Sequence, residues 1–190
     1  MVSAILTTYQ RCELAKRALQ SILAQNFLPA EIIIVEDGSN TGLEEWIASL
    51  GRSEIKYIRH EHNRGLPVAR NTGLKQAKGK LIAYLDDDDE WLPTRLEEQI
   101  KHYYALDLNE RASLACIQVG CMVVDDRGQP VAIGLPKNQG NLKQSIMTIG
   151  ASTPSSCFLF VRDALMAVGG FDEDMISGID HDIWMKLAKA

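Results

Sequence analysis

The sequence predicts an α/β fold in which helices flank a mainly parallel central sheet, with a small antiparallel hairpin added in the second half. Short apolar runs alternate with amphipathic segments from the first residue to about Leu106, as in successive βα units. The apolar runs are aliphatic or β-branched at consecutive positions, which is typical of strands buried on both faces. After Leu114 the alternation stops, and two apolar runs flank the turn sequence Asp125–Gly128, which indicates a hairpin.

The first half divides into strands and the helices between them. We expect the first helix from about Glu13 to Ala24, where apolar residues form one stripe that can pack on the sheet. Thr41 and Glu44 have the spacing of a capping box and predict the start of the second helix. Pro67 and Pro93 suit the first turns of the third and fourth helices. The predicted strands are Val2–Thr8, Glu31–Glu36, Ile55–Arg59 and Leu81–Leu85.

The second half is mixed in character. Residues 136–154 are rich in Gly, Asn, Gln, Ser and Thr and predict a mobile loop that contains a short helix near 142–147. The final helix has no capping residue before the sequence stops at Ala190, so we expect the chain to be truncated there. The other predicted elements are two hairpin strands over 116–124 and 131–134, a strand over 156–161 and a helix over 183–190.

Length and composition favour one globular domain over 1–190. The net charge of -5, from 20 basic and 25 acidic residues, argues against a nucleic-acid-binding surface. No secretory signal follows Met1 and no membrane span is evident, so a cytoplasmic location is expected. The cysteines lack CxxC spacing and are interpreted as buried free thiols. They are Cys12, Cys116, Cys121 and Cys157.

Polar residues follow three of the predicted strands. The run Asp86–Asp89 comes directly after an apolar strand, and each close pair of carboxylates costs roughly 1 kcal/mol in water, so a divalent metal ion is expected beside it. The other two strands lead into Thr7–Arg11 and Glu36–Asn40. Because ligands of parallel sheets bind beyond the carboxyl ends of the strands, these segments predict one shared site.

Simpler interpretations exist for several of these residues. Asp89 suits the cap of the following helix, and Asp37 suits a turn with Gly38. Tyr9 and Arg70 could be a packed surface aromatic residue and a solvated helical charge. The motifs GxGxxG and GxxxxGK[ST] do not occur, which argues against dinucleotide and P-loop enzymes. The histidines that lack metal-cluster spacing, and are interpreted as surface or supporting residues, are His60, His62 and His102.

The order of six motifs gives a more specific indication of function. They run from about Ser3 to Leu187, which is nearly the whole chain. The motifs are T-T-Y-Q-R, V-E-D-G-S, H-N-R-G-L-P-V-A-R-N-T-G, Y-L-D-D-D-D-E-W-L-P, G-G-F-D-E and I-D-H-D-I-W. In this order they resemble the GT-A-type, inverting nucleotide-sugar glycosyltransferases of family 2. The resemblance implies a Rossmann-like sandwich with a nucleotide-binding half, 1–106, and an acceptor-binding half, 107–190.

The resemblance also implies roles for residues of the first half. Thr7 and Tyr9 would line the nucleotide base pocket, with Tyr9 stacked on the base. Asp37 would accept a hydrogen bond from the base. Arg70 would contact the nucleotide side of the pocket, and Asp87 would reach the ribose.

The DxD motif and the base complete the implied site. Asp86 and Asp88 would form the DxD motif, whose last carboxylate binds Mn²⁺ or Mg²⁺, the hard cations that prefer oxygen ligands. Asp180 would be the base that takes the proton of the acceptor hydroxyl, while Asp182, two residues on, is less suited to point the same way. The family pattern has Glu where this chain has Ile179, which bears on acceptor binding.

The sequence therefore predicts a glycosyltransferase that moves a sugar from a nucleoside-diphosphate sugar, most simply a uridine-linked one, to an acceptor hydroxyl by metal-assisted direct displacement. The acceptor would be a glycan, a lipid-linked molecule or another hydroxyl compound. Members of the family often build polysaccharides at the inner membrane face, so peripheral membrane association through regions outside this sequence is also expected. The alternatives are a sugar nucleotidyltransferase and a non-catalytic module that binds nucleotide sugars.

Overall fold

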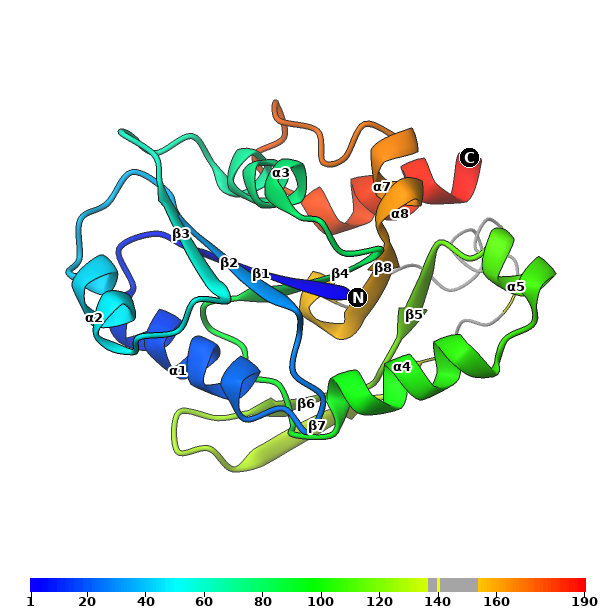
Figure 1. Ribbon diagram of the computed structural model, residues 1–190, viewed down its shortest axis with the longest axis horizontal. Coiled ribbons are helices and arrows are strands. Elements are labelled where there is room, and N and C mark those ends of the chain that lie inside the picture. The colour runs from blue at the N-terminus through cyan, green and yellow to red at the C-terminus, as the bar shows by residue number, and fades with distance from the viewer. Residues whose placement is uncertain (137–139, 141–153) are drawn as a thin grey trace.

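A six-stranded sheet forms the centre of the computed structural model, which describes residues 1–136, 140 and 154–190 (Figure 1). Its strands are β1 (Val2–Thr8), β2 (Glu31–Glu36), β3 (Ile55–Arg59), β4 (Leu81–Asp86), β5 (Cys116–Gln118) and β8 (Phe158–Val161). The order across the sheet is β3-β2-β1-β4-β8-β5. The four amino-terminal strands are parallel, whereas β8 runs antiparallel to both β4 and β5. A separate hairpin consists of β6 (Cys121–Val124) and β7 (Pro130–Gly134).

Helices cover both faces of the sheet. They are α1 (Cys12–Leu23), α2 (Leu43–Ser49), α3 (Leu66–Gln76), α4 (Arg95–Ala105), α5 (Leu108–Ala112), α7 (Arg162–Ala167) and α8 (Ile179–Lys189), with the 3-10 helix η1 (Ser155–Cys157). The helices α1, α2 and α4 pack on one face, and α3, α7 and α8 pack on the other (Figure 1). The result is the three-layer sandwich in which helices cover both faces of one mainly parallel sheet.

The central strands are apolar at consecutive positions because both of their faces are buried. In β4, Leu81 and Ala83 belong to the core beneath α1 and α4, whereas Ile82 and Tyr84 belong to the core beneath α3 and α8. This alternation is the two-residue period of a strand. Aromatic side chains fill the core beneath α3 and α8, where the ring centroids of Phe158 and Trp184 are 3.8 Å apart.

The structure confirms the predicted fold class and corrects several element boundaries. The expected strand over 116–124 is two strands, of which β5 joins the central sheet and β6 forms the hairpin. The predicted capping box at the start of α2 is wrong, because Gly42 is the N-cap and the Thr41 hydroxyl donates to Glu36. The last helix begins at Ile179, earlier than expected. The predicted helix near 142–147, and nearly all of the loop predicted over 136–154, lie outside the described residues.

Two further expectations concern the cysteines and the membrane. All four cysteines are free, and Cys157 is buried while the other three are partly buried. Among the helices of the described residues, none has the length and apolar character needed to cross a bilayer.

Candidate active site

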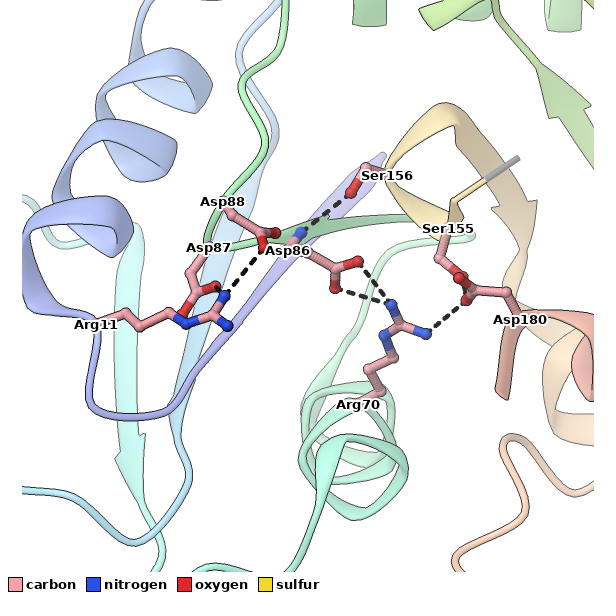
Figure 2. A network of polar contacts seen from close by, with 8 residues as sticks. All are labelled: Arg11, Arg70, Asp86, Asp87, Asp88, Ser155, Ser156 and Asp180. Carbon is pink, nitrogen blue, oxygen red and sulfur yellow. Dashed lines mark hydrogen bonds and ion pairs between the residues drawn. The ribbon is translucent and has the colours of Figure 1, made fainter. Parts of the chain in front are cut away.

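A pocket of about 370 Å³ lies at the carboxyl ends of β1, β2 and β4. Its volume is in the range of small-molecule sites, and its position is the one that parallel sheets offer to ligands. The predicted residues that line it are Thr7, Tyr9, Asp37, Asp86, Asp87 and Asp88. The other predicted residues do not line it: Arg70 contacts the lining residue Asp86, and Asp180 contacts Arg70 (Figure 2).

The acidic turn after β4 is held by the loop after β1. Asp87 accepts a hydrogen bond of 2.7 Å from the Thr8 hydroxyl. A single nitrogen of Arg11, Nη1, donates both to Asp87 Oδ1 at 3.1 Å and to Asp88 Oδ2 at 3.0 Å (Figure 2). Both carboxylates raise the pKa of Arg11, and the carboxylate of Asp87 has the larger effect. The positive charge that the acidic run requires is thus supplied partly by Arg11.

Arg70 connects the acidic turn to helix α8. Its side chain is 1% exposed, and Nη2 donates to both carboxylate oxygens of Asp86 at 2.8 and 2.9 Å. Nη1 donates to Asp180 Oδ1 at 2.7 Å, as Figure 2 shows. The guanidinium also lies 5.1 Å from the ring centroid of Phe171 and 5.9 Å from that of Tyr84, so aromatic faces restrict it as well. Arg70 is neither a solvated helical charge nor part of the pocket lining.

Burial shifts the pKa of two acids in the turn. Burial raises the pKa of Asp86, although the nearby Arg70 charge acts in the opposite direction. Burial also raises the pKa of Asp89, although a hydrogen bond from the Ser156 hydroxyl lowers it. The interpretation of Asp89 as a helix cap is wrong, because the N-cap of α4 is Thr94. Asp89 instead contacts the Ser156 hydroxyl of η1.

Asp37 lies at the end of β2 and is almost fully buried by the loop that precedes α3. Its Oδ1 accepts from the backbone N–H of Arg64 at 2.9 Å, and its Oδ2 from that of Gly65 at 2.8 Å. His60 Nδ1 lies 2.7 Å from Oδ1. Gly38 permits this approach: its φ is +75°, and a Cβ there would lie 2.0 Å from the backbone nitrogen of Asn63.

Asp180 lies in the first turn of α8, with 33% of its side chain exposed. Its Oδ1 accepts from Arg70 and from the Ser155 hydroxyl, so Oδ2 has no protein partner among the described residues. Ile179, which stands where the family pattern has Glu, packs against the core beneath α8. The helix is therefore anchored by an apolar side chain beside an acid with one unengaged oxygen.

Residues 3–169 match the family model described as glycosyl transferase family 2. The chain belongs to this family. Three curated family relatives, uncharacterized glycosyltransferases of Rickettsia species, are 28% to 30% identical to it. The chain spans only 31% to 59% of their length.

Named relatives of this family 2 chain include WfgD of Escherichia coli, a UDP-Glc:α-D-GlcNAc-diphosphoundecaprenol β-1,3-glucosyltransferase. It is 34% identical over 100 residues, which are 53% of this chain and 40% of the relative. The structure of Staphylococcus aureus TarS residues 1–349 with UDP-GlcNAc has a TM-score of 0.75 at 22% identity, covering 98% of this chain and 53% of that one. The mannosyltransferase PcManGT of Pyrobaculum calidifontis, with GDP-Man and Mn²⁺, has a TM-score of 0.66 at 20% identity, covering 95% and 49%. The GT-A-type sandwich is thereby confirmed for this chain.

The family 2 site has a donor set suited to a hard divalent cation. Asp88 is 58% exposed, and the described residues engage only its Oδ2, through Arg11. Within the described part of the chain, no group of three or more His, Cys, Asp or Glu side chains forms a preformed metal site. Magnesium-type sites are often completed by substrate phosphates and water rather than by a protein cage, so a single open carboxylate fits such an ion.

Several residues that shape this site were not predicted. Arg11 belongs to the T-T-Y-Q-R motif, and its positive charge in a segment expected to share a site with the acidic run could have indicated the ion pairs with Asp87 and Asp88. The hydroxyls of Ser155 and Ser156 contact Asp180 and the Asp86 backbone N–H. They gave no sequence signal because they follow a long polar segment that carries no motif. His60 was interpreted only as a surface or supporting residue, and the structure places it against Asp37.

Proposed function

We propose that this chain is the catalytic part of an inverting glycosyltransferase that moves a sugar from a nucleoside-diphosphate sugar to an acceptor hydroxyl. One observation carries the proposal: the acidic turn, Asp37 and Tyr9 surround a single pocket, and Arg70 connects that turn to Asp180. A uridine-linked donor is favoured because the relative WfgD is named for UDP-Glc and the TarS structure holds UDP-GlcNAc.

The nucleoside would bind at the β1 and β2 side of the pocket. Tyr9 is 40% exposed there and offers an aromatic face on which a base can stack. Asp37 would accept an N–H of the base, and Asp87 a hydroxyl of the ribose. Thr7 would form part of the pocket wall. These roles follow from the family resemblance, and the positions of the four residues around one cavity support them.

The diphosphate would lie at the acidic turn. Asp88, with Asp86 beside it in the DxD motif, would hold Mn²⁺ or Mg²⁺. When bound, such an ion stabilises the negative charge that develops on the leaving phosphate oxygen. Arg11, half exposed in the pocket wall, has guanidinium nitrogens that can contact the same diphosphate.

Asp180 would act as the general base. The acceptor oxygen bonds to the anomeric carbon of the donor, its proton passes to Asp180 Oδ2, and the bond from the anomeric carbon to the diphosphate oxygen breaks. A single displacement of this kind inverts the anomeric configuration. Ser155 and Arg70 hold the other oxygen of Asp180, which fixes the direction in which the base points.

The acceptor class follows from the relatives rather than from the pocket. WfgD is named for a lipid-linked GlcNAc diphosphate acceptor, so a lipid-linked or glycan hydroxyl is the acceptor class we propose for the protein to which this chain belongs. Such an acceptor would place the enzyme at the cytoplasmic face of a membrane. Polysaccharide biosynthesis is the corresponding pathway class.

Asp180→Asn tests the proposal directly. Transfer should fall by about 10² to 10⁴-fold, the usual contribution of a general base, while calorimetry shows UDP-sugar affinity close to wild type. Asp182→Asn is the matched control, because Asp182 lies in the same helical turn and its carboxylate pairs with Lys186 at 3.0 Å. Equal measurable transfer by the Asp180 variant and wild type would show that Asp180 is not the base, whereas UDP-sugar binding without transfer by either protein would favour a non-catalytic nucleotide-sugar-binding module.

Metal removal and product analysis separate the remaining alternatives. A chelator or Asp88→Asn should abolish transfer, and added Mn²⁺ should restore activity only in the chelated wild type. The reaction should release a nucleoside diphosphate. Release of pyrophosphate from a nucleoside triphosphate and a sugar phosphate would identify a sugar nucleotidyltransferase instead, and full transfer activity at complete chelation would refute the metal-assisted mechanism.

A further inference from the structure

Asp37 is engaged so fully by the protein that little of its hydrogen-bonding capacity remains. Oδ1 contacts the Arg64 N–H and His60 Nδ1, whereas Oδ2 accepts only from the Gly65 N–H. Each carboxylate oxygen has two lone pairs. Donors from the described residues therefore engage both lone pairs of Oδ1 and one lone pair of Oδ2. One lone pair of Oδ2 remains available to a ligand, because Asp37 lines the pocket.

The direction of the His60 hydrogen bonds follows from this arrangement. A carboxylate has no hydrogen to donate, so Nδ1 of His60 is the donor to Asp37. In the neutral ring Nε2 is then an acceptor, and the Thr72 hydroxyl, 3.0 Å away, donates to it. The chain of donors runs from α3 through the imidazole to the carboxylate. Only 8% of the His60 side chain is exposed, so the ring has little freedom to leave this position.

We infer that His60 and Thr72 are positioning residues for nucleobase recognition, which they perform by orienting Asp37; this rests on the proposed function. Neither residue lines the pocket. Their effect is to keep Asp37 as an acceptor with one open position toward the ligand. The pocket then selects a base that presents an N–H at that point, as uracil does at N3 and guanine at N1, and rejects cytosine and adenine, whose corresponding ring nitrogens are acceptors.

The physical basis of this selectivity is the restraint that His60 places on Asp37. The backbone N–H groups of Arg64 and Gly65 define where the carboxylate lies, but each contacts one oxygen. His60 donates to the lone pair of Oδ1 that the Arg64 N–H does not engage. Without His60, that lone pair would be open to the ligand in addition to the open lone pair of Oδ2. A carboxylate with open positions on both oxygens can accept from the amino group of cytosine as well as from an imide N–H. Loss of His60 should therefore reduce discrimination more than turnover.

The test measures UDP and CDP affinity by calorimetry and transfer kinetics for a set of variants. His60→Leu removes the donor, and it should weaken UDP binding on the order of 10-fold, reduce the preference for UDP over CDP, raise KM for the donor and leave kcat near wild type. His60→Asn keeps a donor near the position of Nδ1 and should restore the preference. Thr72→Val should lower the preference partly, and Thr72→Ser should not. His62→Leu, an exposed neighbour in the same loop, is the control.

The outcomes separate this inference from the proposed function. If wild type prefers UDP over CDP and His60→Leu keeps that preference in full, the positioning role is overturned while the glycosyltransferase proposal stands. If His60→Leu and His60→Asn lose affinity for UDP and CDP equally, His60 is only a packing residue and the inference also fails. If Asp37→Asn retains the wild-type preference, the base does not contact Asp37 and both the inference and the assigned base pocket are wrong. Melting curves with and without UDP establish that each variant is folded.

Discussion

Replacement of Arg70 by Met removes a side chain that contacts both Asp86 and Asp180. Breaking a buried ion pair by removing one partner costs about 3 to 5 kcal/mol, because the other charge stays in the protein without compensation. The carboxylates keep 21% and 33% of their side-chain exposure, so water compensates part of the loss and a value of about 3 kcal/mol is expected. For a chain of this length the melting temperature should then fall by about 6 to 12 °C.

The loss should depend on pH in a direction that the site determines. Burial raises the pKa of Asp86 above its unfolded value, and removal of Arg70 takes away a charge that lowers it. A raised carboxyl pKa stabilises the fold below the unfolded pKa, and that stabilisation is lost as pH rises through the folded pKa. The deficit of Arg70→Met relative to wild type should therefore be largest near neutral pH and shrink as the pH falls through the raised pKa of Asp86.

Thermal melts followed by circular dichroism at several pH values provide the measurement. Arg17→Met is the control, since Arg17 forms an ion pair with Glu90 in which both side chains are more than half exposed. That variant should stay within about 0.5 kcal/mol of wild type. The reasoning is refuted if both variants melt alike, or if the deficit of Arg70→Met grows as the pH falls.

Three further changes have defined expectations. Arg11→Met removes the guanidinium that pairs with Asp87 and Asp88. In the absence of sugar donor, Mn²⁺ should therefore raise the melting temperature of this variant at a lower metal concentration than it does for wild type. An unchanged metal titration would contradict this. Gly38→Ala should abolish nucleotide binding and destabilise the fold, because the new Cβ would meet backbone at 2.0 Å; Gly51→Ala, with a similar positive φ but open space, should lose only about 1 kcal/mol in melts. Tyr84→Phe removes a buried hydroxyl that has no partner among the described residues, so chemical denaturation should show stability equal to wild type or up to about 1 kcal/mol higher, and a clear loss would reveal a partner.

The sequence predicts the parallel part of this fold well because local chemistry determines it. Short runs of consecutive aliphatic and β-branched residues are typical of strands covered on both faces, and the polar residues that end the parallel strands β1, β2 and β4 must meet at one edge of the sheet. Capping was less predictable, since it depends on competing partners. The Thr41 hydroxyl that suited a capping box is engaged by Glu36, and Asp89 contacts Ser156 instead of the helix that follows it.

Contacts between distant segments could not be read from local pattern. Arg70 and Asp180 are 110 residues apart, and their contact depends on how α8 returns to the sheet beside α3. The antiparallel insertion of β8 between β4 and β5 is also a property of the whole chain, because its apolar run would suit either direction. Ser155 and Ser156 reach the site only because β8 pairs with β4, and no motif marks them.

Arg70 connects the proposed leaving-group side of the site to the proposed base. Its Nη2 contacts the first carboxylate of the acidic turn, where the nucleoside diphosphate would leave, and its Nη1 contacts the proposed base. A carboxyl group that has taken a proton is a weaker acceptor from a cation than a carboxylate is. Proton transfer to Asp180 would therefore leave the positive charge of Arg70 less compensated on the acceptor side, at the moment when negative charge develops on the departing diphosphate. The same guanidinium that holds the base in the resting site would then favour the charge distribution of the transition state.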